Sequence, residues 1–185
     1  MVFTRFPKDI LKNEELYQDN LPVIGITWEA ANEYARWKNK ELPEFDQMMK
    51  AITGPDNTIY PWGNKICEQC VNDLINPSTK DKKTIPVDQL LIDETTLQSC
   101  ASWCGAYHLV GNVKEWLRDS PSDNPDEAYI AGCSWREDCR VFGLSYYYAT
   151  ESKISRSNMT GFRCTARSPK KITWRIYKFL FGKFL

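Results

Sequence analysis

Gly-Ala-Tyr-His-Leu-Val-Gly-Asn-Val-Lys-Glu-Trp, residues 105–116, is the segment from which the fold of this chain can be inferred. It mixes glycine with aromatic and acidic residues, a combination too glycine-rich for a plain strand and too dense for a plain helix. Gly105 and Gly111 permit backbone angles that a side chain would forbid, and Asn112 tolerates them next best. The chain is therefore expected to turn sharply here.

Other short motifs lie before and after residues 105–116. In chain order they are PVIGITWEAA at residues 22–31, YPWGN at 60–64, AGCSW at 131–135, CR at 139–140 and GFRC at 161–164. Together with residues 105–116, they resemble the ordered motifs of the formylglycine-generating enzyme family, also called the sulfatase-modifying-factor family. The resemblance covers residues 22–164. It implies an α+β, C-type-lectin-like fold, in which two helices pack on short antiparallel strands with much irregular loop.

The length of 185 residues suits one domain with a sizeable core. We expect residues 1–168 to form the family domain. This domain is expected to be short at its N-terminus, because the family has a longer portion before the motif at residues 22–31. Residues 169–185 are expected to form a separate helical tail.

Charge and composition exclude several classes of protein. The chain has 24 basic and 24 acidic side chains, so it lacks the positive field of a nucleic-acid binder. Residues 1–9 contain no apolar run of signal-peptide length, and no segment reaches the roughly 18 apolar residues of a membrane span. The sequence therefore predicts a cytoplasmic protein. In that compartment, the seven cysteines are expected to be thiols or metal ligands and not a disulfide framework.

Hydrophobic periodicity predicts the regular elements. A short strand is expected over residues 21–26, followed by a helix over residues 28–40 that is capped by Thr27. A second helix is expected to begin at Pro43 and to stop at Gly54. The helix side chains expected on the apolar faces are Ala30, Ala31, Tyr34, Trp37, Phe45, Met48, Met49 and Ile52. Later strands are expected over residues 129–135, 139–148 and 161–166.

Residues 54–102 read as one long loop, which needs something to hold it in place. Four cysteines at the two ends of this loop have the spacing of a tetrahedral zinc site. They are Cys67, Cys70, Cys100 and Cys104. His108 is close enough in sequence to replace one of them. The alternative is that these cysteines are ordinary buried thiols.

Calcium is the other candidate for holding the loops, and it follows only from the resemblance. Family members often bind one or two calcium ions through carbonyl and carboxylate oxygens. The matching positions are Asn72 and Asp81 for one site, and Gly111, Val113 and Glu115 for the other. His108 stands where the family motif has Asp or Asn, and imidazole is a poor ligand for a hard cation. The second calcium site is therefore the weaker of the two.

The catalytic residues of the family are not evident. The resembled oxidase binds copper(I) through two cysteines five positions apart, and the matching positions here are Glu137 and Phe142. The nearest cysteines, Cys133 and Cys139, are six apart. Because an odd change of spacing turns a strand side chain to the opposite face, this pair cannot be assumed to converge. A single histidine also cannot build the iron site of other enzymes with this fold. Copper is therefore not expected, and structural zinc or calcium is left as the candidate metal.

In lectin-like folds the last loops and strands form the ligand-facing surface. Rigid aromatic and arginine side chains typical of binding surfaces are concentrated there. The candidate ligand-binding residues are Trp135, Arg140, Tyr146, Tyr147, Tyr148, Arg156 and Asn158. The leading prediction is thus a non-catalytic module that binds a protein or peptide, of the kind that retroelements diversify in some members of this fold. A divergent copper oxidase acting on a peptide cysteine, with Cys133 and Cys139 as its ligands, is the first alternative.

The second alternative is an effector or scaffold subunit that acts through its tail. Ser168 and Pro169 can begin a helix, and its charged stripe is narrow. Lys171, Arg175 and Lys178 form this stripe at helical spacing, while most other tail residues are apolar. We expect the tail to dock on its own domain or on a partner protein, in preference to lying in a membrane interface, because its apolar arc is wide.

Overall fold

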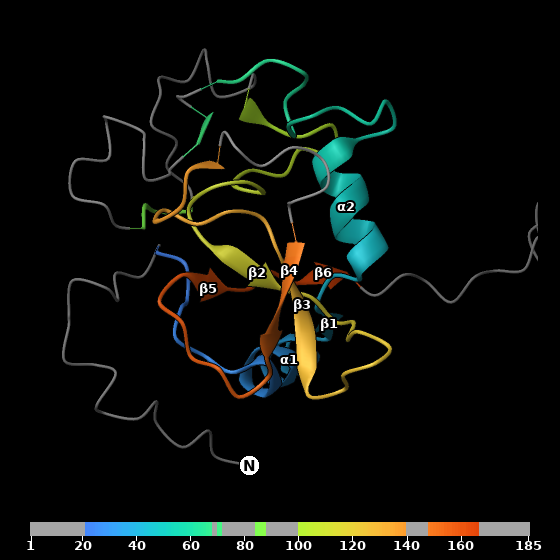
Figure 1. Ribbon diagram of the computed structural model, residues 1–185, viewed down its shortest axis with the longest axis vertical. Coiled ribbons are helices and arrows are strands. Elements are labelled where there is room, and N and C mark those ends of the chain that lie inside the picture. The colour runs from blue at the N-terminus through green and yellow to red at the C-terminus, as the bar shows by residue number, and fades with distance from the viewer. Residues whose placement is uncertain (1–20, 68–69, 72–83, 88–99, 140–147, 167–185) are drawn as a thin grey trace, which may run out of the picture.

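The computed structural model describes residues 21–67, 70–71, 84–87, 100–139 and 148–166, which form an α+β fold with much irregular loop (Figure 1). The helices are α1 (Trp28–Trp37) and α2 (Phe45–Thr53). The strands are β1 (Lys40–Glu41), β2 (Lys114–Trp116), β3 (Glu127–Ala131), β4 (Tyr148–Ser152), β5 (Thr160–Gly161) and β6 (Thr165–Ala166). Within these described residues, no helix has the length and apolar character needed to cross a membrane. The predicted tail helix, residues 169–185, lies outside the described residues.

The central sheet has four strands in the order β4-β3-β2-β5 (Figure 1). Strand β3 pairs antiparallel with both β2 and β4, while β2 and β5 run parallel. The parallel pair departs from the predicted antiparallel arrangement, because the chain crosses from β4 at one edge to β5 at the other. Strand β1 follows α1 directly and pairs antiparallel with β6.

Both predicted helices form, with shifted ends. Thr27 caps α1 as predicted, its Oγ1 accepting a hydrogen bond from the Ala30 N–H at 3.3 Å. Helix α1 ends at Trp37 and not at residue 40, because Asn39 adopts a φ of 55° and Lys40 enters β1. Helix α2 begins at Phe45 and not at Pro43, because the capping box places its N-cap at Glu44.

The buried face of α1 differs from the prediction. Ala31 and Ala35 are the buried residues, whereas Tyr34 is 41% exposed and Trp37 is 60% exposed. Ala30 is exposed as well. The two small buried side chains pack in a cluster with Ile26, Leu42, Trp116, Ala128 and Ile130. Tyr34 and Trp37 therefore lie on the side of α1 that faces away from this cluster.

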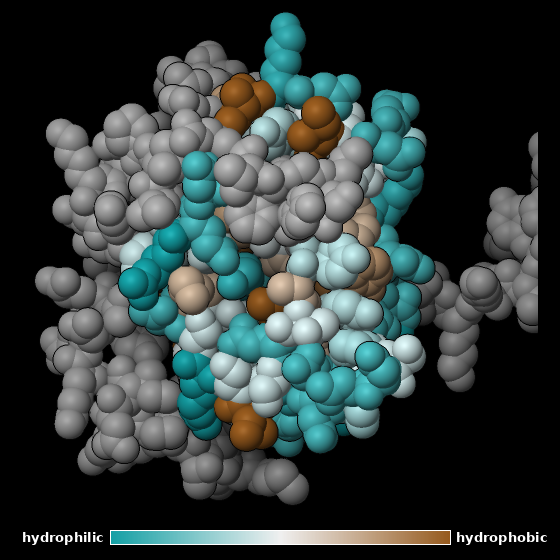
Figure 2. Space-filling model, viewed as in Figure 1, coloured by the Kyte–Doolittle hydropathy of each residue, from teal (hydrophilic) through white to brown (hydrophobic). Residues whose placement is uncertain are grey.

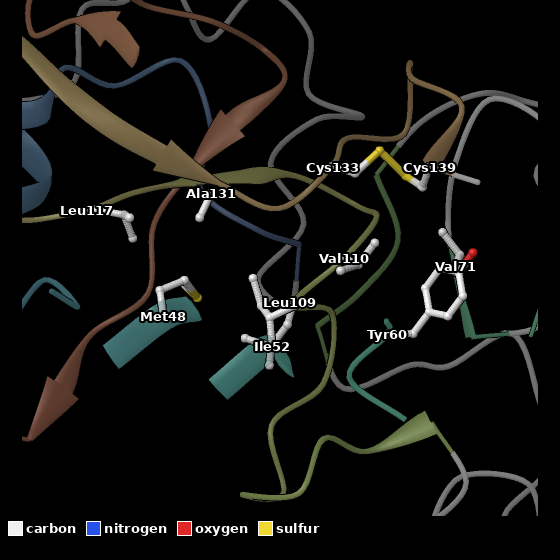
Figure 3. Packing of buried hydrophobic residues seen from close by; sticks show 10 residues of the cluster. All are labelled: Met48, Ile52, Tyr60, Val71, Leu109, Val110, Leu117, Ala131, Cys133 and Cys139. Carbon is white, nitrogen blue, oxygen red and sulfur yellow. A yellow bond between two sulfur atoms is a disulfide. The ribbon is translucent and has the colours of Figure 1, made fainter. Parts of the chain in front are cut away.

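Helix α2 packs on the second core cluster as predicted (Figure 3). Met48 and Ile52 are buried, and Phe45 and Met49 pack at the edge of the cluster. The other members of the cluster are Tyr60, Val71, Leu109, Val110, Leu117, Ala131, Cys133 and Cys139. Met→Ala or Ile→Ala changes at such positions typically cost about 2–5 kcal/mol.

Residues 105–116 turn sharply, as their sequence predicts. Gly105, Gly111 and Asn112 all have positive φ values, of 78°, 87° and 65°. The buried Asn112 side chain accepts a hydrogen bond from the Ile85 N–H and donates one to the Ile85 carbonyl, both at 3.1 Å. Trp116 is fully buried, and its Nε1 donates to the Ile26 carbonyl at 3.2 Å. This motif therefore fastens distant loops to the core.

Three strand predictions are wrong in their bounds. Residues 21–26 form no strand. The strand predicted over 129–135 spans Glu127–Ala131, and the strand predicted over 161–166 is divided into β5 and β6. Strand β3 stops because Gly132 has a φ of 85° and approaches the Leu109 carbonyl so closely that a Cβ would lie 2.8 Å from its oxygen. Most of the strand predicted over 139–148 lies outside the described residues.

Candidate functional site

The cysteines nearest to the family's copper positions form a disulfide, Cys133–Cys139 (Figure 3). The two side chains thus converge, contrary to the expectation from their spacing. They do so because residues 132–139 are not a strand: after Gly132 the chain reverses in a turn in which the Glu137 N–H donates to the Ser134 carbonyl at 3.0 Å. Both cysteines are buried. Because thiolates are the copper ligands, the bonded sulfurs do not fit copper(I) in this state.

Glu137, at the first expected copper position, has a structural role. It accepts hydrogen bonds from the Ser134 N–H at 2.9 Å, from Ser134 Oγ at 2.7 Å and from Lys114 Nζ at 3.1 Å. Burial alone raises the pKa of this carboxyl, but the Ser134 hydrogen bonds and the Lys114 charge together lower the pKa below its ordinary value. Phe142, the second position, lies outside the described residues.

The cysteines of the predicted zinc site are only partly brought together. Cys70 and Cys100 form a disulfide, and the Cys67 Sγ lies 2.9 Å from the Cys70 Sγ. The three sulfurs lie within 4.8 Å of one another. Cys104 does not join them: it is exposed, with its Sγ 3.2 Å from the Ser102 Oγ. Disulfide sulfurs are poor zinc ligands, so zinc binding requires reduction first and stays a prediction.

The expectation of thiols is therefore corrected for four of the seven cysteines. Cys67, Cys104 and Cys164 are thiols. Spacing alone did not reveal the pairing, because Cys70 and Cys100 are 30 residues apart and meet only through the tertiary fold.

The carboxylate of the second predicted calcium site has a cationic partner from within the chain. Arg163 Nη2 donates to Glu115 Oε1 at 2.7 Å, and Arg163 Nε donates to Oε2. The same Nη2 donates to the carbonyls of Tyr107 and His108, at 3.0 and 3.3 Å. The guanidinium thus pairs with the Glu115 carboxylate, which is one of the three predicted ligands of this calcium site. Asn72 and Asp81 lie outside the described residues.

The structure describes four of the seven residues of the predicted ligand-binding surface. Trp135 is half-buried, its Nε1 donates to the Asn158 carbonyl at 3.3 Å, and the guanidinium of Arg136 lies over its ring. Arg156 and Asn158 are exposed in the loop between β4 and β5. Tyr148 is 43% exposed but packs edge-on against Phe45. Arg140, Tyr146 and Tyr147 lie outside the described residues, so the surface as a whole stays a prediction.

A groove of about 640 Å³ opens beside α1. Its apolar walls come mainly from the segment before α1, from α1 itself and from the residue after β5, with further contributions from Val87 and from the residue before β2. These wall residues are Leu21, Pro22, Val23, Ile26, Ala30, Tyr34, Val87, Val113 and Phe162. Glu115, Arg163, His108 and Asn112 supply the polar part of the lining. The volume lies within the roughly 300–1,000 Å³ range of ligand sites.

The lining of the groove is mostly apolar. On the face shown in Figure 2, the most hydrophobic residues among those in colour lie apart from one another. Such isolated exposure is ordinary. At the groove, by contrast, Tyr34 packs edge-on against Phe162, with ring centroids 5.4 Å apart, and Trp37 lies next to Tyr34 at 5.7 Å. Lys38 Nζ lies over the Trp37 ring at 4.2 Å. An aromatic ridge therefore extends from the groove across α1.

A thiol also lines this groove. Cys164 is half-buried, and burial raises the pKa of its thiol, with an opposing effect from the Lys40 charge. Sequence reasoning missed the groove because it placed Tyr34 and Trp37 in the core. The presence of Ala31 and Ala35 on one side of α1 was the available signal that a small-residue face, and not the aromatic face, is buried.

Comparison with known proteins shows the family to which the chain belongs. The sulfatase-modifying factor enzyme 1-like domain matches residues 2–168. Inactive C-alpha-formylglycine-generating enzyme 2 of Bos taurus is 28% identical over 151 residues, which are 78% of this chain and 50% of that protein. The formylglycine-generating enzyme of Thermomonospora curvata is 32% identical over 111 residues, covering 54% of this chain and 34% of that enzyme. The chain thus spans half or less of the length of these relatives.

Solved structures confirm the fold. PvdO from Pseudomonas aeruginosa has a TM-score of 0.65 at 16% identity, covering 80% of this chain and 63% of its own. Treponema denticola variable protein 1 has a TM-score of 0.59 at 16% identity, covering 80% of this chain and 72% of its own. The C-type-lectin-like fold predicted from the sequence is therefore confirmed.

Proposed function

Because the chain belongs to the sulfatase-modifying factor enzyme 1-like domain family, we propose that it is a non-catalytic member, which binds an apolar segment of a protein or peptide in the groove beside α1. The observation that carries this proposal is the contiguous apolar wall formed by Val23, Tyr34 and Phe162. Its similarity to a relative named inactive supports the absence of catalysis. The predicted surface around Trp135 and Asn158 remains a second candidate contact.

A protein or peptide suits this groove better than a small polar ligand. The cationic Arg163 is already paired with Glu115, so the groove offers little unsatisfied charge for a polar ligand. The exposed aromatic side chains of Tyr34 and Trp37 extend the contact surface beyond the groove. Rigid aromatic side chains of this kind carry much of the binding energy in protein interfaces.

The copper oxidase is the second candidate, because Cys133 and Cys139 do converge. Two findings weigh against it. Both sulfurs are buried and bonded to each other, and neither cysteine lines the described groove. Glu137, which would have to be a copper ligand by motif position, is bound to Ser134.

The test is to select groove-binding peptides and to map their contacts. Twelve-residue peptides from a display library are selected on the full chain and then measured by fluorescence anisotropy. Val23→Asp and Tyr34→Ala should weaken the selected peptides about tenfold or more, because each removes apolar contact from the groove. Ile154→Asp is the matched control, since Ile154 is 78% exposed and lies outside the groove lining. Equal affinity in all variants, or loss only with Arg156→Ala and Asn158→Ala, would contradict the groove as the binding site.

A further inference from the structure

The second sulfur cluster of the molecule, formed by Cys67, Cys70 and Cys100, is built around the YPWGN motif. Residues 60–64 form a tight turn in which Tyr60 and Gly63 exchange backbone hydrogen bonds, and the Tyr60 and Trp62 rings stack at 5.4 Å. Trp62 then packs against the sulfur cluster, together with Tyr107. The Cys70 N–H donates to the Cys67 carbonyl at 3.0 Å, which holds the two cysteines next to each other. The motif thus holds a thiol beside a disulfide.

We propose that these three cysteines form a thiol–disulfide exchange site. The Cys67 Sγ lies 2.9 Å from the Cys70 Sγ, in direct contact with one end of the Cys70–Cys100 disulfide. Cys70 and Cys100 are only 4% and 3% exposed, whereas Cys67 is half-buried. Cys67 is therefore both the nucleophile nearest to the disulfide and the cysteine that an incoming thiol can reach.

The exchange between the three cysteines conserves bonds, electrons and protons. The Cys67 thiolate attacks Cys70 Sγ, a Cys67–Cys70 bond forms, and the Cys70–Cys100 bond breaks. The electron pair leaves on Cys100 Sγ, which takes up a proton equivalent to the one that Cys67 lost to solvent. No oxidant or reductant is consumed in this step. An external thiolate then attacks the more accessible Cys67 Sγ, forming a mixed disulfide there and releasing Cys70 as a thiolate.

The chain contains a second disulfide and a second thiol that serve as controls for the reactivity of the three-cysteine cluster. The Cys133–Cys139 disulfide has both sulfurs buried, at 0% and 2% exposed. It should therefore resist a small thiol under native conditions. Cys104 is an exposed thiol outside the sulfur cluster, so Cys104→Ser controls for the loss of a reactive cysteine.

The first measurement uses the unaltered chain. Native protein at pH 8 is trapped with N-ethylmaleimide and digested, and its disulfides are mapped by mass spectrometry. A Cys67–Cys70 linkage with alkylated Cys100 is expected beside the Cys70–Cys100 linkage. If the Cys70–Cys100 linkage alone is present, after prolonged incubation as well, the proposal is overturned.

The second measurement is the rate at which reduced glutathione opens the Cys70–Cys100 disulfide. Cys67→Ser should slow this rate about tenfold or more, because the attacking sulfur is lost. Cys104→Ser should leave the rate unchanged, and Cys133–Cys139 should stay oxidised in every variant. The Cys67→Ser chain retains both disulfides, and far-UV circular dichroism verifies that it is folded. Equal rates in Cys67→Ser and the unaltered chain would also overturn the proposal.

Discussion

Arg163 and Glu115 form a bidentate ion pair in the wall of the groove, where Nη2 and Nε of the guanidinium donate to the two carboxylate oxygens. The Glu115 side chain is 8% exposed. Burial by itself lowers the pKa of Arg163, but the charge and hydrogen bonds of Glu115 raise it above the ordinary value. The pair joins β2 to the chain just after β5, so it connects the central motif to the end of the domain.

Removing the carboxylate should therefore destabilise the fold. Glu115→Gln leaves the half-buried guanidinium without its buried counter-charge, and we expect the free energy of unfolding to fall by about 3 kcal/mol. Urea denaturation measures this change. The control is Glu41→Gln, which breaks the half-exposed Arg118–Glu41 pair and should cost less than about 1 kcal/mol. Similar losses in the two variants would contradict the special role of the buried pair.

Glu137 should make stability depend on pH. Its folded-state pKa is lowered from the ordinary value of 4.5, so its contribution is present above that value and is lost as pH falls through the folded pKa. Glu137→Gln should lower stability at pH 7 by about 1–2 kcal/mol and should flatten the acid limb of the Tm profile. Glu33→Gln, on the exposed side of α1, is the control. An unchanged acid limb in Glu137→Gln would show that Glu137 does not contribute to the pH dependence of stability.

Gly132 should be intolerant of any side chain. Gly132→Ala combines a φ of 85° with a Cβ only 2.8 Å from the Leu109 carbonyl oxygen, so we expect a loss of about 2 kcal/mol or more. Gly25→Ala separates the two effects, since Gly25 has a φ of 69° but nothing within 4 Å of its added Cβ. It should lose only about 1–2 kcal/mol. Thermal unfolding compares them, and an equal loss would show that the close approach has no cost.

The two thiols Cys104 and Cys164 should react at different rates. Cys104 is exposed, whereas burial raises the pKa of the Cys164 thiol above its ordinary value of 9.0. Because the thiolate is the reactive form, N-ethylmaleimide should label Cys104 first at pH 7.5, and Cys164 labelling should rise above pH 9. Mass spectrometry of the labelled peptides measures both. A peptide bound in the groove should slow labelling of Cys164 and not of Cys104; equal protection would place the peptide elsewhere.

Copper chemistry gives a separate test of the catalytic alternative. The unaltered chain is expected neither to bind copper(I) tightly nor to convert a cysteine in a sulfatase-type peptide to an aldehyde. Competition with a copper(I) chelator and mass spectrometry of the peptide check the two outcomes. Turnover that Cys139→Ser abolishes and Cys104→Ser leaves intact would establish the oxidase and contradict the non-catalytic proposal.

The family, the fold class and both helices were predictable from the sequence, because they depend on local features. Residues 105–116 carry their turn in Gly105, Gly111 and Asn112, and Thr27 caps α1 through a side chain three residues from its partner. The apolar face of α2 was also predictable, since Met48 and Ile52 recur at helical spacing. Such features need no knowledge of distant parts of the chain.

The sites depended on the tertiary structure, because they join residues that are far apart in sequence. Cys70 meets Cys100 across 30 residues, and Arg163 reaches Glu115 across 48. The convergence of Cys133 and Cys139 followed from a backbone reversal at Gly132 that a strand-based count of spacing does not include. The two helices and the sharp turn in residues 105–116 could thus be predicted from the sequence alone, whereas the strand bounds could not. Only the packing of those elements decided which sulfurs pair, which carboxylate is neutralised and which face of α1 is left exposed, because each of these depends on what neighbouring segments bring within contact distance.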